Sequence, residues 1–328
     1  MTNAPSLKDI AALQSELGDQ VLRTPVMRCR ALEPYAGGNT TVYAKLEFLQ
    51  HTGTFKARGA LAVVNSLSEE QRKAGVTAVS AGNHAIATAF AAWAAGTSAK
   101  IVMISTANPA RIAACRAYGA ELVLTDDIHK AFVLAEGIQN DEGRFFVHPF
   151  EGRQIATGTG TVGLELCEQC ADFDVVIVPV GGGGLIGGVA NAVKQLRPDA
   201  MVIGVEPEGA DSMHRSFIAG EPQAIDRVRT IADSLGAPFA MPYSFNLCRS
   251  NVDKLVRVDD FQLRSSMGLL FEKMKLAVEP ACAASTAALL GPLRDELQGK
   301  RVALVLCGSN IDWTTYSDQV IYEYGYTA

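Results

Sequence analysis

The feature that most constrains the fold is a regular alternation of short aliphatic runs with longer amphipathic segments. The runs are rich in Val, Ile and Leu, as expected of buried strands. They cover residues 41–48, 76–81, 100–105, 120–125, 175–180, 201–206 and 301–306. Helical patterns lie between them at residues 57–75, 83–96, 109–119 and 186–198. This order predicts an α/β fold with mainly parallel, open twisted sheets flanked by helices.

The chain length indicates more than one core. With 328 residues, 48% of them apolar, the chain can bury two packed domains. No Gly/Ser-rich linker separates them, so we expect interleaved domains. Residues 75–150 hold three strand–helix units and form the predicted small domain. Residues 1–74 and 151–328 form the predicted large domain.

Charge and cysteine content limit the partners and the cellular compartment that we expect for this chain. The net charge of −6 argues against nucleic acid or an anionic membrane as the main partner. The sequence offers no apolar stretch of the ~18 residues that a membrane span needs, and its first residues do not resemble a signal peptide. Seven scattered cysteines predict free thiols in a reducing, cytoplasmic compartment. Cys167 and Cys170 have CxxC spacing without a second pair, which favours a structural role.

Ligands of parallel α/β sheets bind where strands end and helices begin. Lys56 lies in such a junction, at the start of a helical pattern. The helix dipole and the nearby Arg58 are expected to lower the pKa of its ammonium group, which favours the neutral amine needed for imine formation. Residues 80–84, Ser-Ala-Gly-Asn-His, form a second junction, suited to binding a carboxylate or phosphate through backbone N–H groups.

Two further junctions carry small residues. Gly181, Gly182, Gly183 and Gly184, followed by Leu185, let the backbone surround an anion at a helix start without Cβ obstruction. The segment lacks the GK[ST] ending of a nucleoside-triphosphate loop and the usual GxGxxG spacing of a dinucleotide site. Cys307, in the segment Cys-Gly-Ser-Asn, follows the last strand.

In this order the four segments resemble the fold-type II (tryptophan synthase β-like) pyridoxal-phosphate (PLP) enzymes, most closely the serine/threonine dehydratase group. The resemblance covers nearly the whole chain. It extends to residues 22–26 (LRTPV), 45–47 (KLE), 230–233 (TIAD) and 278–280 (VEP).

The resemblance implies a role for each segment. Lys56 would carry PLP as a Schiff base, Phe55 would pack beside the ring, and Cys307 would face the pyridine nitrogen. Gly181 to Gly184 and Leu185 would bind the phosphate. The substrate carboxylate would bind the loop of Ser80, Ala81, Gly82, Asn83 and His84, with Asn83 also reaching the phenolic oxygen of the cofactor.

The activity implied is dehydration and deamination of a small β-hydroxy L-amino acid, such as threonine or serine, to a 2-oxo acid and ammonia. Thr159 and Ser234 depart from the dehydratase pattern, which leaves open a bulkier substrate of the phenylserine or hydroxyaspartate type. Ala81 replaces the second base of serine racemases, so racemisation is disfavoured. Ala57 and His84 disfavour a β-replacement synthase. Relatives suggest a homodimer.

The resemblance also points to a cation site. Its ligands would be Glu206 and the Ala210 carbonyl, with Ser212 in place of the usual Asp. Oxygen ligands suit Mg²⁺ or Ca²⁺, but the lost charge equally fits a monovalent cation or no metal. The remaining histidines, among them His148, lack the spacing of metal ligands and are expected to be structural or solvent-facing.

Overall fold

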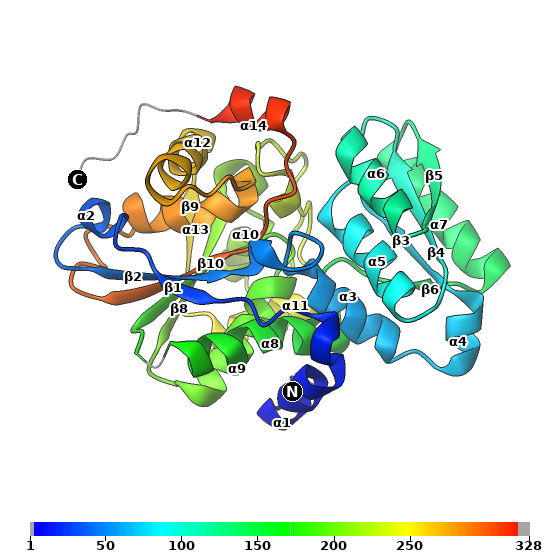
Figure 1. Cartoon of the computed structure of the whole chain (residues 1–328), viewed down its shortest axis with the longest axis horizontal. Coiled ribbons are helices and arrows are strands. Elements are labelled where there is room, and N and C mark those ends of the chain that lie inside the picture. Colours follow the sequence, from blue (N-terminus) through cyan, green and yellow to red (C-terminus); the bar gives the residue numbers. More distant parts are fainter. Residues whose placement is uncertain (1–2, 171, 321–328) are drawn as a thin grey trace.

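The computed structural model describes residues 3–170 and 172–320, which fold into two α/β bodies that lie side by side (Figure 1). Each body has its own sheet. The strands are β1 (Val26–Arg28), β2 (Thr41–Leu46), β3 (Val76–Val79), β4 (Ala99–Ile104), β5 (Glu121–Thr125), β6 (Phe145–Phe146), β7 (Val175–Pro179), β8 (Met201–Pro207), β9 (Lys254–Val258) and β10 (Arg301–Leu306).

The helices cover both faces of the two sheets. They are α1 (Leu7–Leu17), α2 (Glu33–Ala36), α3 (Lys56–Asn65), α4 (Glu69–Ala74), α5 (Asn83–Ala94), α6 (Pro109–Ala117), α7 (Ile128–Glu142), α8 (Arg153–Gln169), α9 (Gly184–Leu196), α10 (Ser212–Ala219), α11 (Pro242–Asn251), α12 (Asp260–Leu269), α13 (Pro280–Leu290) and α14 (Trp313–Gln319). In Figure 1, α12 and α13 lie on one face of the larger sheet, with α8 and α9 on the other. In the described residues, no helix is both long and apolar enough to cross a bilayer.

The larger sheet has the order β1-β2-β10-β7-β8-β9, and only β1 runs antiparallel to its neighbour. Its strands β7 and β10 are buried along most of their length, as expected of a sheet covered on both faces. The smaller sheet, β5-β4-β3-β6, is entirely parallel and uses only strands between Val76 and Phe146. Helices α5 and α6 cover one face and α7 the other (Figure 1).

The structure agrees with the predicted α/β architecture and with each predicted strand, and it adds β1, β6 and β9. One predicted helix is wrong in extent, because residues 57–75 form two helices, α3 and α4. Ser68 begins the second helix with a capping box: its hydroxyl accepts from Gln71 N at 3.2 Å, and Gln71 Oε1 accepts from Ser68 N at 2.9 Å. The reciprocal pair stabilises a helix start where the apolar pattern alone suggested continuity.

Candidate active site

Three neighbouring parallel strands position the candidate site. Strands β2, β10 and β7 lie side by side, so their carboxyl ends meet at one edge of the larger sheet. The segment after β2 leads to Lys56, the residue after β10 is Cys307, and the loop after β7 holds the four glycines. Strand β3 of the smaller sheet ends at Val79 and delivers the loop of residues 80–84 from the opposite side.

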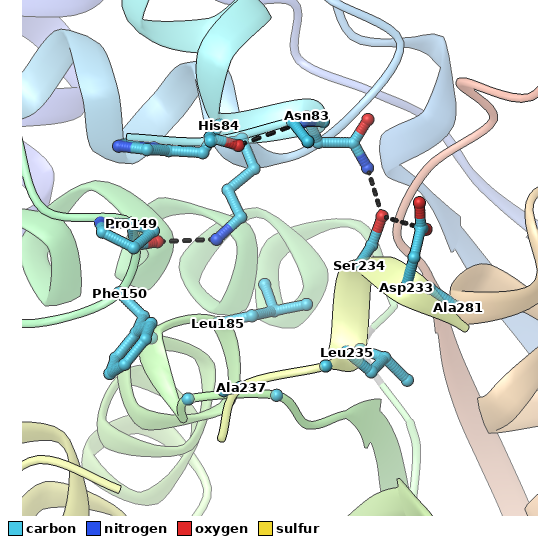
Figure 2. Close-up of a pocket in the computed structure, with 18 of the residues that line it drawn as sticks. Asn83, His84, Pro149, Phe150, Leu185, Asp233, Ser234, Leu235, Ala237 and Ala281 are labelled. Atoms are coloured by element: carbon cyan, nitrogen blue, oxygen red, sulfur yellow. Dashed lines mark hydrogen bonds between the residues drawn. The ribbon is translucent and has the colours of Figure 1, made fainter. Parts of the chain in front are cut away.

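These segments line one cavity of about 560 Å³ between the two bodies. Figure 2 shows Asn83 and His84 on one side, with Leu185, Leu235 and Phe150 on the other. Every residue that the sequence predicted to contact cofactor or substrate carboxylate lines this cavity: Phe55, Lys56, Ser80, Ala81, Gly82, Asn83, His84, Gly181, Gly182, Gly183, Gly184, Leu185 and Cys307. The volume is within the range of small-molecule sites.

Lys56 is the first residue of α3, and its Nζ donates to Pro149 O at 2.6 Å. Burial lowers the pKa of Lys56 to about 8. Arg58 was predicted to help lower this pKa, and that explanation is wrong. Its guanidinium is buried and pairs with two carboxylates, those of Glu47 at 2.8 Å and Glu165 at 2.7 Å, which neutralise its charge. Desolvation of the amine is the cause.

The glycine loop leaves no room for side chains. A Cβ at Gly182 would lie 2.4 Å from the Phe150 ring, and one at Gly184 would lie 2.8 Å from the Phe150 backbone. Gly183 has φ +89°, a conformation that favours glycine. The loop ends at Gly184, the first residue of α9, where N–H groups have no partner within the helix. A phosphate group fits such a cradle.

A hydrogen-bond network joins the 80–84 loop to the larger body. Asn83 Nδ2 donates to Ser234 Oγ at 3.0 Å (Figure 2) and to Glu279 Oε1 at 2.8 Å. Its Oδ1 accepts from Asn310 Nδ2 at 2.9 Å. Glu279 is fully enclosed, burial raises its pKa, and its Oε2 has no hydrogen-bond partner in the described structure. The cavity wall therefore contains a buried polar atom that lacks a hydrogen-bond partner in the described structure.

The thiol of Cys307 stays neutral. A hydrogen bond with Cys282, together with burial, raises the pKa of Cys307. The group that the resemblance places opposite the pyridine nitrogen therefore carries no charge.

Two histidines in the cavity wall are also uncharged. Burial and the nearby Lys56 lower the pKa of His84 to about 3 and that of His148 to about 4. His84 Nε2 lies 2.8 Å from Val147 O. His148 has the structural role expected of it, since its Nδ1 accepts from the backbone N–H groups of Phe150 and Glu151, but it also lines the cavity, which was not predicted.

The sequence interpretation missed an aromatic wall. Phe132, Phe146, Phe150 and Phe239 all line the cavity. The ring centroids of His148 and Phe150 are 4.6 Å apart, and those of Phe150 and Phe239 are 6.3 Å apart. The segment FFVHPF at residues 145–150 was the available signal, because aromatic residues make up only 7% of the chain.

Arg111 is a second missed residue, and it connects the two bodies. From α6 its Nη1 reaches Asp233 Oδ2 at 2.5 Å, and its Nη2 reaches Asn310 O at 3.1 Å. Although Arg111 lines the cavity beside Gly82, its charge is balanced by Asp233.

The cation site stays a prediction. Both oxygens of Glu206 accept backbone N–H groups, from Met213 at 2.9 Å and His214 at 2.6 Å. Ser212 Oγ donates to Ala237 O at 3.1 Å, and Ala210 is buried in the turn between β8 and α10. The described part of the chain holds no cluster of three or more His, Cys, Asp or Glu side chains suited to a metal.

Together, a buried amine with a lowered pKa and a glycine cradle for an anion define the class of protein: an enzyme that binds an aldehyde cofactor bearing a phosphate. The family model described as pyridoxal-phosphate dependent enzyme matches residues 17–308, and the chain belongs to this family.

Individual proteins similar to this chain indicate which group within the family it resembles. The chain is 54% identical to a phenylserine dehydratase from Ralstonia pickettii, over 96% of each chain. It is 40% identical to an L-threonine ammonia-lyase from Thermotoga maritima, over 94% of this chain and 76% of the relative. Among solved structures, maize serine racemase superposes with a TM-score of 0.91 at 33% identity, covering 96% of each chain.

These matches confirm the predicted family, fold class, PLP cofactor and enzyme class. The chain is a PLP-dependent lyase of the dehydratase group, with a small amino acid as its substrate.

Proposed function

We propose that this enzyme dehydrates and deaminates L-β-hydroxy amino acids with an aromatic side chain, the 3-phenylserine class, to the 2-oxo acid and ammonia. The observation that carries the proposal is the aromatic wall, with phenylalanines contributed by both bodies. Rings of this kind favour a flat apolar substituent through burial and edge-to-face contacts. The relative from Ralstonia pickettii is named for the same substrate class.

The charges of the cavity support an uncharged substituent. Low pKa values keep His84 and His148 neutral, and Arg111 is paired with Asp233. Apart from Lys56, the described residues that line the cavity therefore offer no free cation for a second carboxylate, which disfavours a hydroxyaspartate substrate because a buried unpaired charge is costly.

The residues of the chain divide the binding task between two helix starts. We infer that the phosphate binds Gly181 to Gly184 at the start of α9, and that the substrate carboxylate binds residues 80–84 at the start of α5. In both places N–H groups lack partners within the helix. The neutral thiol of Cys307 follows the end of β10 and lines the same cavity as these two loops.

Lys56 performs the proton transfers in this proposal. Its lowered pKa leaves a useful fraction of neutral amine near physiological pH, both to hold the cofactor and to take the α-proton of the substrate. When bound, PLP supplies a conjugated ring that withdraws electrons from the substrate Cα. Loss of the α-proton and the β-hydroxyl releases water, and later hydrolysis uses one water, so the net products are a 2-oxo acid and ammonia. Ala81 offers no proton for the opposite face.

We further propose that residues 75–150 move as a small domain that closes on the substrate and excludes water. A homodimer fits the exposed apolar side chains of Phe261, Phe271 and Trp313, which lie on or next to helices α12 and α14 at one end of the larger body (Figure 1). The seven buried free cysteines fit a cytoplasmic location.

A substrate panel tests the proposal. The purified holoenzyme is assayed for 2-oxo acid and ammonia with L-threo-3-phenylserine, L-threonine, L-serine and L-threo-3-hydroxyaspartate. We expect the highest kcat/KM for phenylserine and the lowest for hydroxyaspartate. A higher kcat/KM for threonine or serine than for phenylserine refutes the proposed substrate class.

A further inference from the structure

Phe132 differs from the other phenylalanines of the cavity wall in its surroundings. Ring contacts hold Phe146 against His148 and join Phe150 to Phe239. Phe132 lies on α7 and is 50% exposed although it lines the cavity. A half-exposed large apolar side chain at the edge of a cavity is informative, because burial of that surface would be favourable.

The part of helix α7 that carries Phe132 is packed against the smaller sheet. Its neighbour Ala131 and the residue one turn on, Ala135, are buried against Val79 and Val102 of the smaller sheet. Phe132 therefore belongs to the smaller body, whereas Phe239 belongs to the larger one and Phe150 packs against the glycine loop of the larger body. An aromatic group that enters the cavity between the bodies can contact rings from both.

We propose that Phe132 determines specificity by closing over the aryl ring of the substrate, so that the exposed half of its own ring is buried only when an aromatic substituent is bound. This inference rests on the proposed function and deepens it. The methyl group of threonine is too small to cover the Phe132 ring, so Phe132 contributes little to binding that substrate.

Two variants and one control separate this role from general packing. Phe132→Ala removes the ring, and Phe132→Leu keeps an apolar side chain without aromatic contacts. Val133→Ala is the control, because Val133 is the next residue of α7, is 69% exposed and does not line the cavity. Each holoenzyme is assayed with L-threo-3-phenylserine and L-threonine. The Kd for L-phenylalanine, which lacks a β-hydroxyl leaving group, is measured by calorimetry.

For Phe132→Ala we expect kcat/KM for phenylserine to fall by about tenfold or more, and Kd for L-phenylalanine to rise by about the same factor. For L-threonine, the change should stay within about threefold, since a small side chain leaves the ring exposed. Phe132→Leu should lie between wild type and Phe132→Ala, and Val133→Ala should match wild type.

Two outcomes overturn the inference. One is an equal loss for both substrates, which indicates damage to the fold or to the shared chemistry. The other is an unchanged Kd for L-phenylalanine in Phe132→Ala. If the wild-type enzyme itself does not prefer phenylserine, the proposed function fails first, and this result is visible before any variant is made.

Discussion

The buried charge network around Arg58 gives the sharpest test of how this fold is held together. Arg58 contacts Glu47 and Glu165, and Lys45 Nζ also contacts Glu165 at 2.5 Å. The four side chains are almost fully buried and their formal charges balance. Arg58→Met removes one positive charge from this set while keeping an apolar side chain of similar length.

The expected loss of stability follows from the contacts that the two glutamates keep when Arg58 is replaced. After the substitution, Glu165 keeps its ion pair with Lys45, whereas Glu47 keeps a hydrogen bond from the hydroxyl of Thr24 at 2.5 Å but no direct ion pair among the described residues. Leaving one buried charge uncompensated costs about 3–5 kcal/mol. With an unfolding entropy of about 2.1 cal/mol/K per residue over 328 residues, that loss lowers Tm by about 4–7 °C.

The assay is thermal unfolding followed by tryptophan fluorescence and by calorimetry, and the chain supplies a matched control. Arg23 and Glu168 form an ion pair of 2.6 Å, but their side chains are 52% and 41% exposed. Arg23→Met should therefore cost less than about 1 kcal/mol.

A double variant makes the reasoning refutable. Arg58→Met combined with Glu47→Gln leaves only Lys45 and Glu165, whose charges balance again. We expect the double variant to be more stable than the sum of the two single losses predicts, by at least about 1 kcal/mol. Strict additivity, or a loss for Arg58→Met no larger than that for Arg23→Met, would show that burial of these charges does not govern their contribution.

Three shorter predictions concern the cavity. The rate at which apoenzyme captures PLP should rise with pH around a midpoint near the Lys56 pKa of about 8, because only the neutral amine reacts. A midpoint near the pKa of an ordinary lysine would contradict the argument that burial lowers the pKa of Lys56. Gly182→Ala should weaken PLP binding, measured by spectral titration, because the new methyl group would lie 2.4 Å from the Phe150 ring; Gly137→Ala, where nothing lies within 4 Å, should leave PLP affinity unchanged. Glu279→Gln should change the free energy of unfolding by less than about 1 kcal/mol. The reason is that burial already raises the pKa of Glu279 and so favours its neutral form. A loss of stability above about 2 kcal/mol would indicate a charged carboxylate at this position.

The sequence predicted the sheet-forming segments and the loops that follow them, because both signals are local. A strand buried on both faces needs a run of aliphatic residues, as in residues 175–180, and a loop that binds an anion needs small residues immediately afterwards. Parallel strands then bring these loops to one edge without further information. For this reason Lys56, the glycine loop and Cys307 meet in one cavity as predicted.

Contacts between distant segments were not predictable in the same way. Arg58 pairs with Glu165, 107 residues away, and the local sequence favoured an effect on Lys56 instead. His148 and Phe150 follow β6, a strand of only two residues, which is too short to leave a pattern. The aromatic wall needs rings from both bodies, so its existence depends on how the bodies meet and cannot be read from any single segment.

Burial acts in opposite directions on acids and bases, so it reduces the charge of the cavity wall, whereas the core beneath the cavity keeps its ion pairs. Desolvation lowers the pKa of Lys56 and His84 and raises that of Glu279, so in each case burial shifts the equilibrium toward the neutral form. Arg58 is equally buried but keeps its charge because carboxylates surround it. Because burial weakens the charge of these side chains, helix N-termini are left to help balance the anions that we propose for the cofactor and the substrate. The glycine loop at α9 and the 80–84 loop at α5 provide these N-termini from two different sheets, so their separation would fix the orientation of the substrate Cα relative to Lys56.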